Sequence, residues 1–185
     1  MRDKLVETSK FLSYVLRHEP GAIGVALDSE GWLAIPALIE GAARAGRRLD
    51  RALIEAVVAG NDKKRFALSD DGQRIRAVQG HSSAGVALTH REAAPPPVLY
   101  HGTATRFLDA ILREGLRPGA RHHVHLSADE ETARKVGSRH GKPVVLRVDA
   151  AAMQAQGLRF YLSGNGVWLT AEVPARHLGA MAGPA

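Results

Sequence analysis

Three consecutive prolines, Pro95–Pro97, restrict what this chain can fold into more than any other feature of its sequence. Proline fixes φ near about −65° and has no amide hydrogen, so a run of three favours extended polyproline geometry and donates nothing to a helix or sheet. The preceding segment, Thr89–Ala94, contains few apolar residues. We therefore predict a linker over residues 89–97, between one lobe over 1–88 and a second over 98–185.

Composition excludes several classes of protein. The 185 residues are 45% hydrophobic and 24% charged, which is typical of a soluble globular chain. The absence of cysteine excludes a disulfide framework, a thiolate zinc site and a cysteine nucleophile. No apolar run approaches the roughly 20 residues of a membrane span, and the N-terminus lacks a signal-peptide pattern. We expect a cytoplasmic protein with no membrane partner.

The net charge points to an anionic partner. It is +6, with a pI near 10.1, and both halves of the chain share the excess. This density is below that of a purely electrostatic DNA-binding protein, so individual arginines in particular places matter more than a basic patch.

The sequence of the first lobe predicts helices followed by a hairpin, which is a winged-helix-like pattern. Apolar residues at helical spacing, a proline at a first helical position and Asp50 as an N-cap mark its helices. Turn residues mark two hairpins. The expected elements are a helix over 3–17, a hairpin of Val25–Leu27 with Trp32–Ala34 around the turn Asp28–Gly31, helices starting at Pro36 and over 51–59, and a hairpin of Arg65–Leu68 with Arg74–Val78.

The sequence of the second lobe predicts short strands that outnumber its helices. This pattern favours an α+β fold with a mostly antiparallel, sandwich-like sheet. The expected strands are 98–100, 124–126, 144–148, 159–162 and 167–169, and the expected helices are 106–114, 128–136 and 150–156.

Three motifs of the first lobe could hold a phosphate, and each also has a structural interpretation. Arg17 and His18 end the first helix, where the dipole alone favours cations, yet the pair could also grip a phosphate and move a proton. Asn61–Phe66 carries three adjacent cations that fit a solvated loop or a phosphate clamp. Gln79–Ser82 offers polar donors or forms a plain turn.

The densest motif is Arg121–Ser127, Arg-His-His-Val-His-Leu-Ser. In a strand, His123 and His125 share a face, which raises the question of a metal site. Arg121 lies on that same face and would repel a dication, so we predict no metal. Ser127 and Glu130 have capping-box spacing, and a helix N-terminus beside histidines is also a pyrophosphate site.

Together these motifs resemble those of the KptA-type RNA 2′-phosphotransferases, NAD-dependent enzymes that remove an internal 2′-phosphate from RNA. Neither a Rossmann nor a P-loop fingerprint is present. The resemblance covers almost the whole chain in order, through Leu12–His18, Asn61–Phe66, Gln79–Ser82, His101–Thr103, Arg121–Ser127 and Asn165–Leu169.

The resemblance implies a role for each matching residue. The second lobe is expected to have an ADP-ribosyltransferase-like fold and to bind NAD, which the reaction consumes. The first lobe is expected to bind RNA that carries a 2′-phosphate. No obligate protein partner is implied. The implied catalytic residues are Arg17, His18, Arg65 and Arg121. The implied NAD-binding residues are His101, Gly102, Thr103, His123, His125 and Ser127. The implied RNA phosphate contacts are Arg17, Lys64, Arg65, Gln79 and His81.

The implied reaction passes through an ADP-ribosylated phosphate and releases nicotinamide and ADP-ribose 1″,2″-cyclic phosphate. Toxin-like ADP-ribosyltransferases use a late glutamate to activate the acceptor, and the matching segment Asn165–Thr170 has no carboxylate. A phosphate dianion is already a nucleophile and needs no such base. Two alternatives stay open: an ADP-ribosyltransferase acting on nucleic-acid phosphate ends, and a winged-helix nucleic-acid-binding regulator, which the modest charge of the first lobe disfavours.

Overall fold

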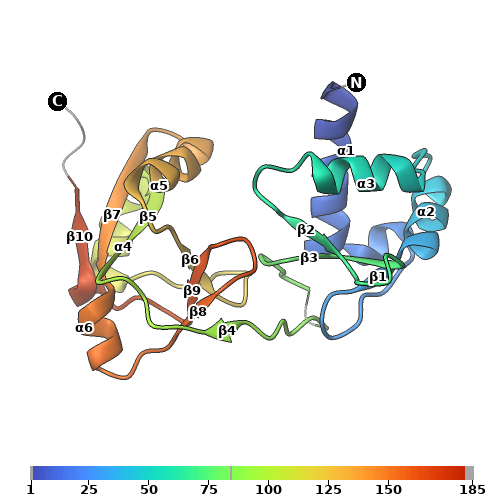
Figure 1. Cartoon of the computed structure of the whole chain (residues 1–185). Coiled ribbons are helices and arrows are strands. Elements are labelled where there is room, and N and C mark those ends of the chain that lie inside the picture. The colour runs from blue at the N-terminus through green and yellow to red at the C-terminus, as the bar shows by residue number, and fades with distance from the viewer. Residues whose placement is uncertain (1, 84, 182–185) are drawn as a thin grey trace. The chain divides into compact units, whose positions relative to one another are not determined.

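A computed structural model describes residues 2–83 and 85–181 of the chain. It divides into two compact units, residues 1–89 and 90–185, each with its own apolar core (Figure 1). Helices and strands both contribute to each unit, so the protein is α+β. Within the described residues, no helix is both long and apolar enough to cross a bilayer. The winged-helix and ADP-ribosyltransferase assignments of the two lobes stay predictions.

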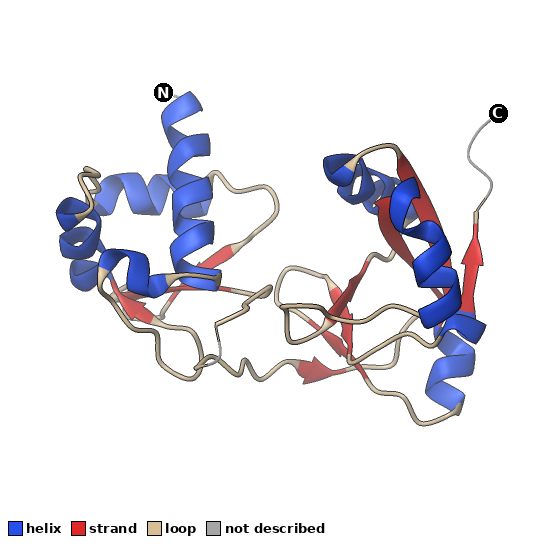
Figure 2. Ribbon diagram, turned by 180° about the vertical axis from the view of Figure 1, so that it is seen from behind, coloured by secondary structure: helices blue, strands red, loops and turns tan. Residues whose placement is uncertain are grey.

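The first unit packs three helices against one side of a small antiparallel sheet (Figure 2). Its strand order is β1-β3-β2, and its core joins Leu12 and Leu16 of the first helix to Leu38, Ile54 and Ile75. Asp50 caps α3 by accepting from the Leu53 amide at 2.8 Å, as predicted. The elements are α1 (Arg2–Arg17), the 3-10 helix η1 (Pro20–Ile23), β1 (Leu33–Ala34), α2 (Ile35–Arg44), α3 (Arg51–Ala59), β2 (Phe66–Leu68) and β3 (Arg74–Ala77).

The first predicted hairpin is wrong, although its turn is present. The Gly31 amide donates to Asp28 O at 2.9 Å, but residues 25–27 form no strand. Instead β1 pairs with β3, which places Leu33 opposite Ile75. Both of these side chains are buried in the core, so the distant pairing removes apolar surface from water, whereas a local two-stranded hairpin alone is marginal. The second hairpin, β2 with β3, is confirmed.

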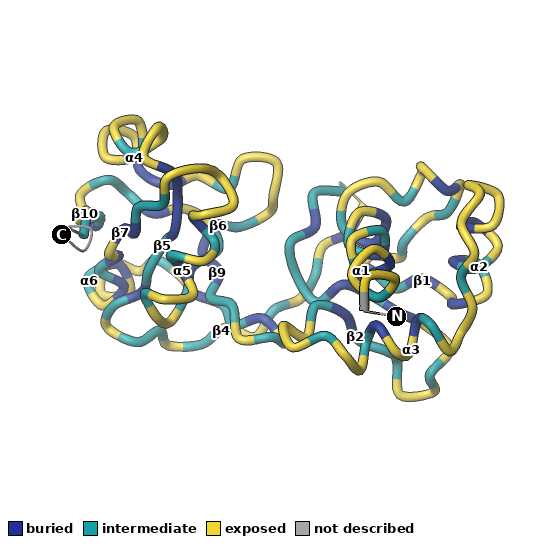
Figure 3. Tube along the Cα trace, turned by 90° about the horizontal axis from the view of Figure 1, so that it is seen from above, coloured by how far each residue is buried: buried dark blue, intermediate teal, exposed yellow. Residues whose placement is uncertain are grey.

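The second unit contains two antiparallel sheets, of order β10-β7-β5 and β4-β8-β9-β6. A single bridge between Tyr100 and Ser127 joins β5 to the segment that follows β6. Helix α4 is exposed along most of its length (Figure 3). The elements are β4 (Arg91–Glu92), β5 (Val98–Ala104), the 3-10 helix η2 (Thr105–Phe107), α4 (Leu108–Glu114), β6 (Val124–Leu126), α5 (Glu130–Gly137), the 3-10 helix η3 (Ser138–His140), β7 (Pro143–Asp149), α6 (Ala150–Ala155), β8 (Phe160–Leu162), β9 (Trp168–Thr170), the 3-10 helix η4 (Ala175–His177) and β10 (Leu178–Ala180).

Part of the predicted linker belongs to a sheet. Arg91 and Glu92 form β4, which pairs with β8, and the Ala93 amide donates to Phe160 O at 3.0 Å. These residues precede the prolines and keep their amide hydrogens, so they can complete a sheet edge, whereas Pro95–Pro97 cannot donate. The irregular part of the segment is therefore shorter than the sequence suggested.

The predicted cap of α5 is also wrong. Asp129, rather than Ser127, is the N-cap, and its carboxylate accepts from the Thr132 amide at 2.7 Å. Ser127 exchanges two backbone hydrogen bonds with Tyr100, at 2.8 and 2.9 Å. This pairing holds Ser127 in extended geometry, so the helix begins two residues later than predicted.

Candidate active site

The C-terminal end of α1 contacts a segment that is distant in sequence. His18 Nδ1 and Ser82 Oγ are hydrogen-bonded at 2.8 Å, and the Ser82 amide donates to Arg17 O at 2.8 Å. Gly80 lies against the Arg17 side chain, because a Cβ added there would be 3.7 Å from Cδ and Nη1 of Arg17. The fold thus brings together the Arg17–His18 and Gln79–Ser82 motifs. His18 and Ser82 are 64 residues apart in the sequence.

The Asn61–Arg65 segment is a tight turn built around the Asn61 side chain. Asn61 Oδ1 accepts from the Lys63 amide at 3.2 Å and from Arg65 Nη1 at 3.4 Å. Lys64 has φ of 42°, the left-handed region that residues other than glycine rarely adopt, and its amide donates to Asn61 O at 2.8 Å. Both the side chain and the carbonyl of Asn61 therefore hold this turn together.

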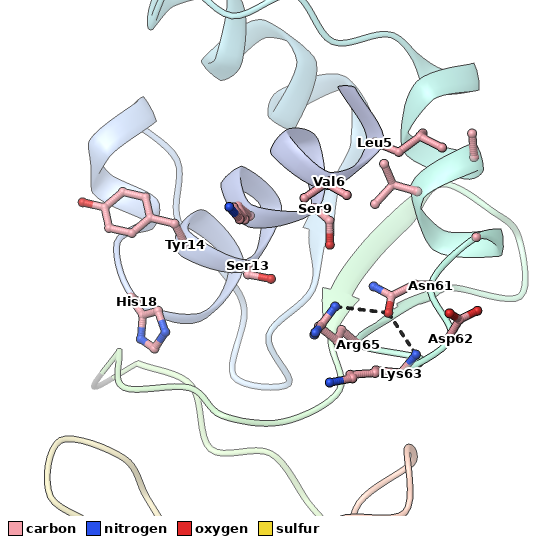
Figure 4. A pocket seen from close by; sticks show the side chains of 14 residues that line it. Leu5, Val6, Ser9, Ser13, Tyr14, His18, Asn61, Asp62, Lys63 and Arg65 are labelled. Atoms are coloured by element: carbon pink, nitrogen blue, oxygen red, sulfur yellow. Dashed lines mark hydrogen bonds between the residues drawn. The ribbon is translucent and has the colours of Figure 1, made fainter. Parts of the chain in front are cut away.

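His18 and Arg65 line one hollow of about 640 Å³ that lies within the first unit (Figure 4). Its walls come from α1, from the C-terminal end of α3 and from the turn after α3. Lys63 also lines it, whereas Lys64 does not. Two predicted catalytic side chains from distant positions thus face the same space. The lining residues are Leu5, Val6, Ser9, Lys10, Ser13, Tyr14, His18, Ala56, Val57, Gly60, Asn61, Asp62, Lys63 and Arg65.

Three other predicted phosphate contacts lie outside the walls of this hollow. The Arg17 side chain lies against Gly80, and Gln79 precedes that glycine. His81 is only 3% exposed and packs on Gly31, where an added Cβ would be 2.9 Å from its Nε2. What the structure shows for His81 is therefore a packing contact inside the first unit.

In the second unit, the two strands predicted to bind the dinucleotide, β5 and β6, are linked through two histidines. His101 Nδ1 lies 3.1 Å from His125 O, and His125 Nδ1 lies 3.0 Å from His123 O. A carbonyl only accepts, so each Nδ1 carries the hydrogen, and in the neutral ring Nε2 is then an acceptor. These contacts bring His101, His123 and His125 together, with Ser127 at the adjoining bridge.

Burial lowers the pKa of His101, and the charges of His140 and Arg121 lower it further, against the opposing effect of its hydrogen bond to His125 O. Burial and His122 also lower the pKa of His123. Both rings are therefore held neutral near pH 7. Arg121 itself is exposed in a turn closed by its amide, which donates to Pro118 O at 3.2 Å.

Gly102 and Thr103 differ from His101 in what surrounds them. A Cβ at Gly102 would come within 1.6 Å of Ala133 O, so α5 packs directly on the backbone of β5 at this point. Side chains alternate along a strand, so His101 points to the opposite face. Thr103 is buried. The structure thus gives Gly102 a packing role, and its predicted role in NAD binding stays a prediction.

Sequence reasoning missed several residues of these sites. In the first unit they include Ser9 and Ser13, which lie four residues apart on α1 and so share the face that reaches His18. In the second unit, His123 lies between two rings, with ring centroids 5.9 Å from His90 and 5.7 Å from Tyr161. The helical spacing of the two serines could have predicted that they share a face with the site. The strand register that places Tyr161 of β8 beside His123 could not be predicted from the sequence.

Comparison with known proteins places this arrangement in a family. A model of the "RNA 2'-phosphotransferase, Tpt1 / KptA family" matches residues 3–172. The chain belongs to the Tpt1/KptA family. Within that family it is 64% identical over 182 residues to a probable RNA 2′-phosphotransferase of Pseudomonas fluorescens, which covers 98% of this chain and 100% of the relative. It is 59% identical over 175 residues to the RNA 2′-phosphotransferase of Escherichia coli K12, with 95% of each chain covered.

The Tpt1/KptA match includes every predicted site residue, from Arg17 to Ser127. It also spans both units, so the family relationship applies to the motifs of the first unit that are predicted to bind RNA and to the histidines of the second.

Proposed function

We propose that this chain is an NAD-dependent RNA 2′-phosphotransferase. Membership of the Tpt1/KptA family and the names of its relatives support the transfer of a 2′-phosphate. The observation that carries the proposal for this chain is the shared hollow of His18 and Arg65, with Arg17 next to His18 at the end of α1. A guanidinium that faces the same space as an imidazole can hold the phosphate while the imidazole moves the proton of the second step.

In the reaction that this relationship implies, the RNA 2′-phosphate attacks the ribose C1″ of NAD and displaces nicotinamide. The ribose 2″-hydroxyl then attacks the phosphorus, and the bond to the RNA 2′-oxygen breaks. The hydroxyl's proton passes to the departing RNA oxygen, which leaves RNA with a 2′-hydroxyl and ADP-ribose 1″,2″-cyclic phosphate. The residues of this chain have two tasks in it. They orient two anionic reactants against one another, and they stabilise charge on the phosphoryl oxygens.

Arginines perform both tasks in the proposal. Arg65 would grip the 2′-phosphate from the turn, where Asn61 Oδ1 fixes one end of its guanidinium at 3.4 Å. Arg17 would bind the phosphate with its planar fork, a geometry that lysine cannot reproduce. Arg121 would contribute from the second unit. No carboxylate base is required, because a phosphate dianion is nucleophilic without one.

His18 is the proposed group for proton transfer. The hydrogen bond between its Nδ1 and Ser82 Oγ, at 2.8 Å, orients the ring. An imidazole can both donate and accept a proton, which the second step requires.

His101 and His125 fit the ribose hydroxyls of a dinucleotide. Each ring directs Nδ1–H to a carbonyl. In a neutral ring of this tautomer Nε2 has acceptor character, which suits a hydroxyl donor. The lowered pKa of His101 keeps it in this neutral form. These residues therefore suit NAD without a Rossmann or P-loop cradle.

The test is incubation of the purified chain with an oligoribonucleotide that bears one internal 2′-phosphate, with and without NAD and in the presence of EDTA. Mass spectrometry should show NAD-dependent loss of the phosphate and formation of ADP-ribose cyclic phosphate despite the chelator. ADP-ribose retained on the RNA would instead indicate an ADP-ribosyltransferase that stops after the first step. Unchanged RNA would refute the proposal.

Arg65→Ala should abolish this turnover. Arg48→Ala is the matched control, because Arg48 is an exposed arginine of the same unit that does not line the hollow, and it should leave turnover unchanged. Turnover of Arg65→Ala within threefold of the wild type would remove Arg65 from the proposed catalytic set.

A further inference from the structure

The hollow that contains His18 and Arg65 is much larger than a phosphate group. Its volume of about 640 Å³ is within the range of pockets that hold drug-sized ligands. It follows α1 from His18 back to Val6, and twelve residues of α-helix rise by about 18 Å. A phosphate at the His18 end would leave most of this space for a neighbouring group.

The chemistry of the hollow changes along its length. The turn after α3 brings the cations Lys63 and Arg65, the Asn61 amide and the Asp62 carboxylate to the hollow, and His18 lines it at the end of α1 (Figure 4). Leu5 and Val6 of α1 and Ala56 and Val57 of α3 contribute apolar surface, and Ser9 and Ser13 lie along α1 between Val6 and His18. This sequence of surfaces matches a nucleotide, with its charged phosphate, hydroxylated ribose and flat apolar base.

Two exposed apolar side chains support an occupant for this space. Val6 and Tyr14 are each 50% exposed, the highest values among the large hydrophobic residues that the structure describes as exposed. Both line the hollow, one toward each end of the α1 wall. An exposed apolar surface that adjoins a cationic site is typical of ligand-binding grooves.

We infer that the groove between α1 and α3 binds the nucleoside next to the 2′-phosphorylated nucleotide of the RNA. This inference rests on the proposed function for the position of the phosphate. The base of that neighbour packs on the floor of Val6 and Ala56, and its ribose faces Ser9 and Ser13. The first unit thus recognises a dinucleotide element rather than an isolated phosphate.

The test measures binding rather than turnover. Three oligoribonucleotides each carry one 2′-phosphate and a fluorescent label, with neighbouring nucleotides on both sides, on the 5′ side only or on the 3′ side only. Fluorescence anisotropy without NAD gives Kd for each. For the wild type, removal of the neighbour that occupies the groove should weaken binding by about tenfold, the typical effect of one base contact.

Two neutral substitutions from different helices disturb the groove. Ala56→Gln fills it, and Val6→Ser removes part of its apolar floor. Both positions are exposed, so the fold should persist. Ala52→Gln is the control, because Ala52 is an exposed alanine one turn earlier on α3 that does not line the hollow. Ala56→Gln and Val6→Ser should weaken binding of the full oligonucleotide and leave the oligonucleotide without the groove neighbour unaffected.

The possible outcomes separate the two proposals. Equal affinity of the wild type for all three oligonucleotides, or equal weakening of all three by Ala56→Gln, would refute the inference that the groove binds the neighbouring nucleoside. NAD-dependent turnover without any effect of the neighbours would leave the proposed function standing and the groove refuted. Neighbour-dependent binding that Ala56→Gln removes, without NAD-dependent turnover, would support the groove and refute the function.

Discussion

Substitution of Gly102 by alanine tests the packing of α5 against β5. A Cβ at this position would lie 1.6 Å from Ala133 O, 2.5 Å from Ala133 C and 2.9 Å from Gly137 N. The optimal separation of such atoms is about 3.5 Å, so α5 would have to move by about 2 Å. All three atoms belong to the backbone, and no change of rotamer relieves the overlap.

The expected cost is at the upper end of the range for overpacking, about 3 kcal/mol. In a unit of this size, a loss of 3 kcal/mol corresponds to a fall in Tm of roughly 12–24 °C. Differential scanning calorimetry should show this fall for Gly102→Ala. Ala133→Gly should not rescue it, because the obstructing atom is the carbonyl oxygen and not the Ala133 methyl group.

Gly179→Ala is the matched control, because nothing lies within 4 Å of the Cβ position of this strand glycine in the same unit. Its Tm should stay within about 4 °C of the wild type, the scale of a surface substitution of about 0.5 kcal/mol. If Gly102→Ala were equally neutral, the inferred contact between α5 and β5 would be wrong. A fall in stability would instead show that the glycine of the His-Gly-Thr motif is required for packing, whatever its contribution to NAD binding.

Three further predictions concern the second unit. Asp129→Ala should lower its stability by about 1 kcal/mol through loss of the α5 cap, while Ser127→Ala should not remove that cap; urea denaturation compares the two. Burial lowers the pKa of His101, so the unfolded chain takes up that proton at a higher pH than the folded chain. Stability should therefore fall as the pH drops below about 6.5, and a Tm–pH profile should show a smaller loss for His101→Asn. Arg121→Ala should abolish removal of the 2′-phosphate with an unchanged circular dichroism spectrum; turnover near that of the wild type would exclude Arg121 from the catalytic set.

Local signals in the sequence were sufficient for most elements. The apolar spacing of α1, the Asp50 cap and the turn between β2 and β3 each predicted the observed structure, because each depends on residues close together in the chain. Predictions failed where a distant partner competed with a local one. The Val25–Leu27 strand did not form because β3 offered Leu33 a buried pairing, and Ser127 did not cap α5 because Tyr100 held its backbone.

For the candidate site, the sequence by itself determined which residues are predicted to carry the chemistry. The ordered motifs from Arg17 to Ser127 determined the family resemblance, because their types and spacing are properties of the chain alone. Only the tertiary structure decided what faces the same space: His18 with Arg65, Lys63 in place of Lys64, and an apolar groove along α1. The physical reason is that a side chain's direction depends on the backbone geometry of turns and on packing between distant segments. The left-handed Lys64 and the contact of α5 with Gly102 show that neither is encoded in a short window of sequence.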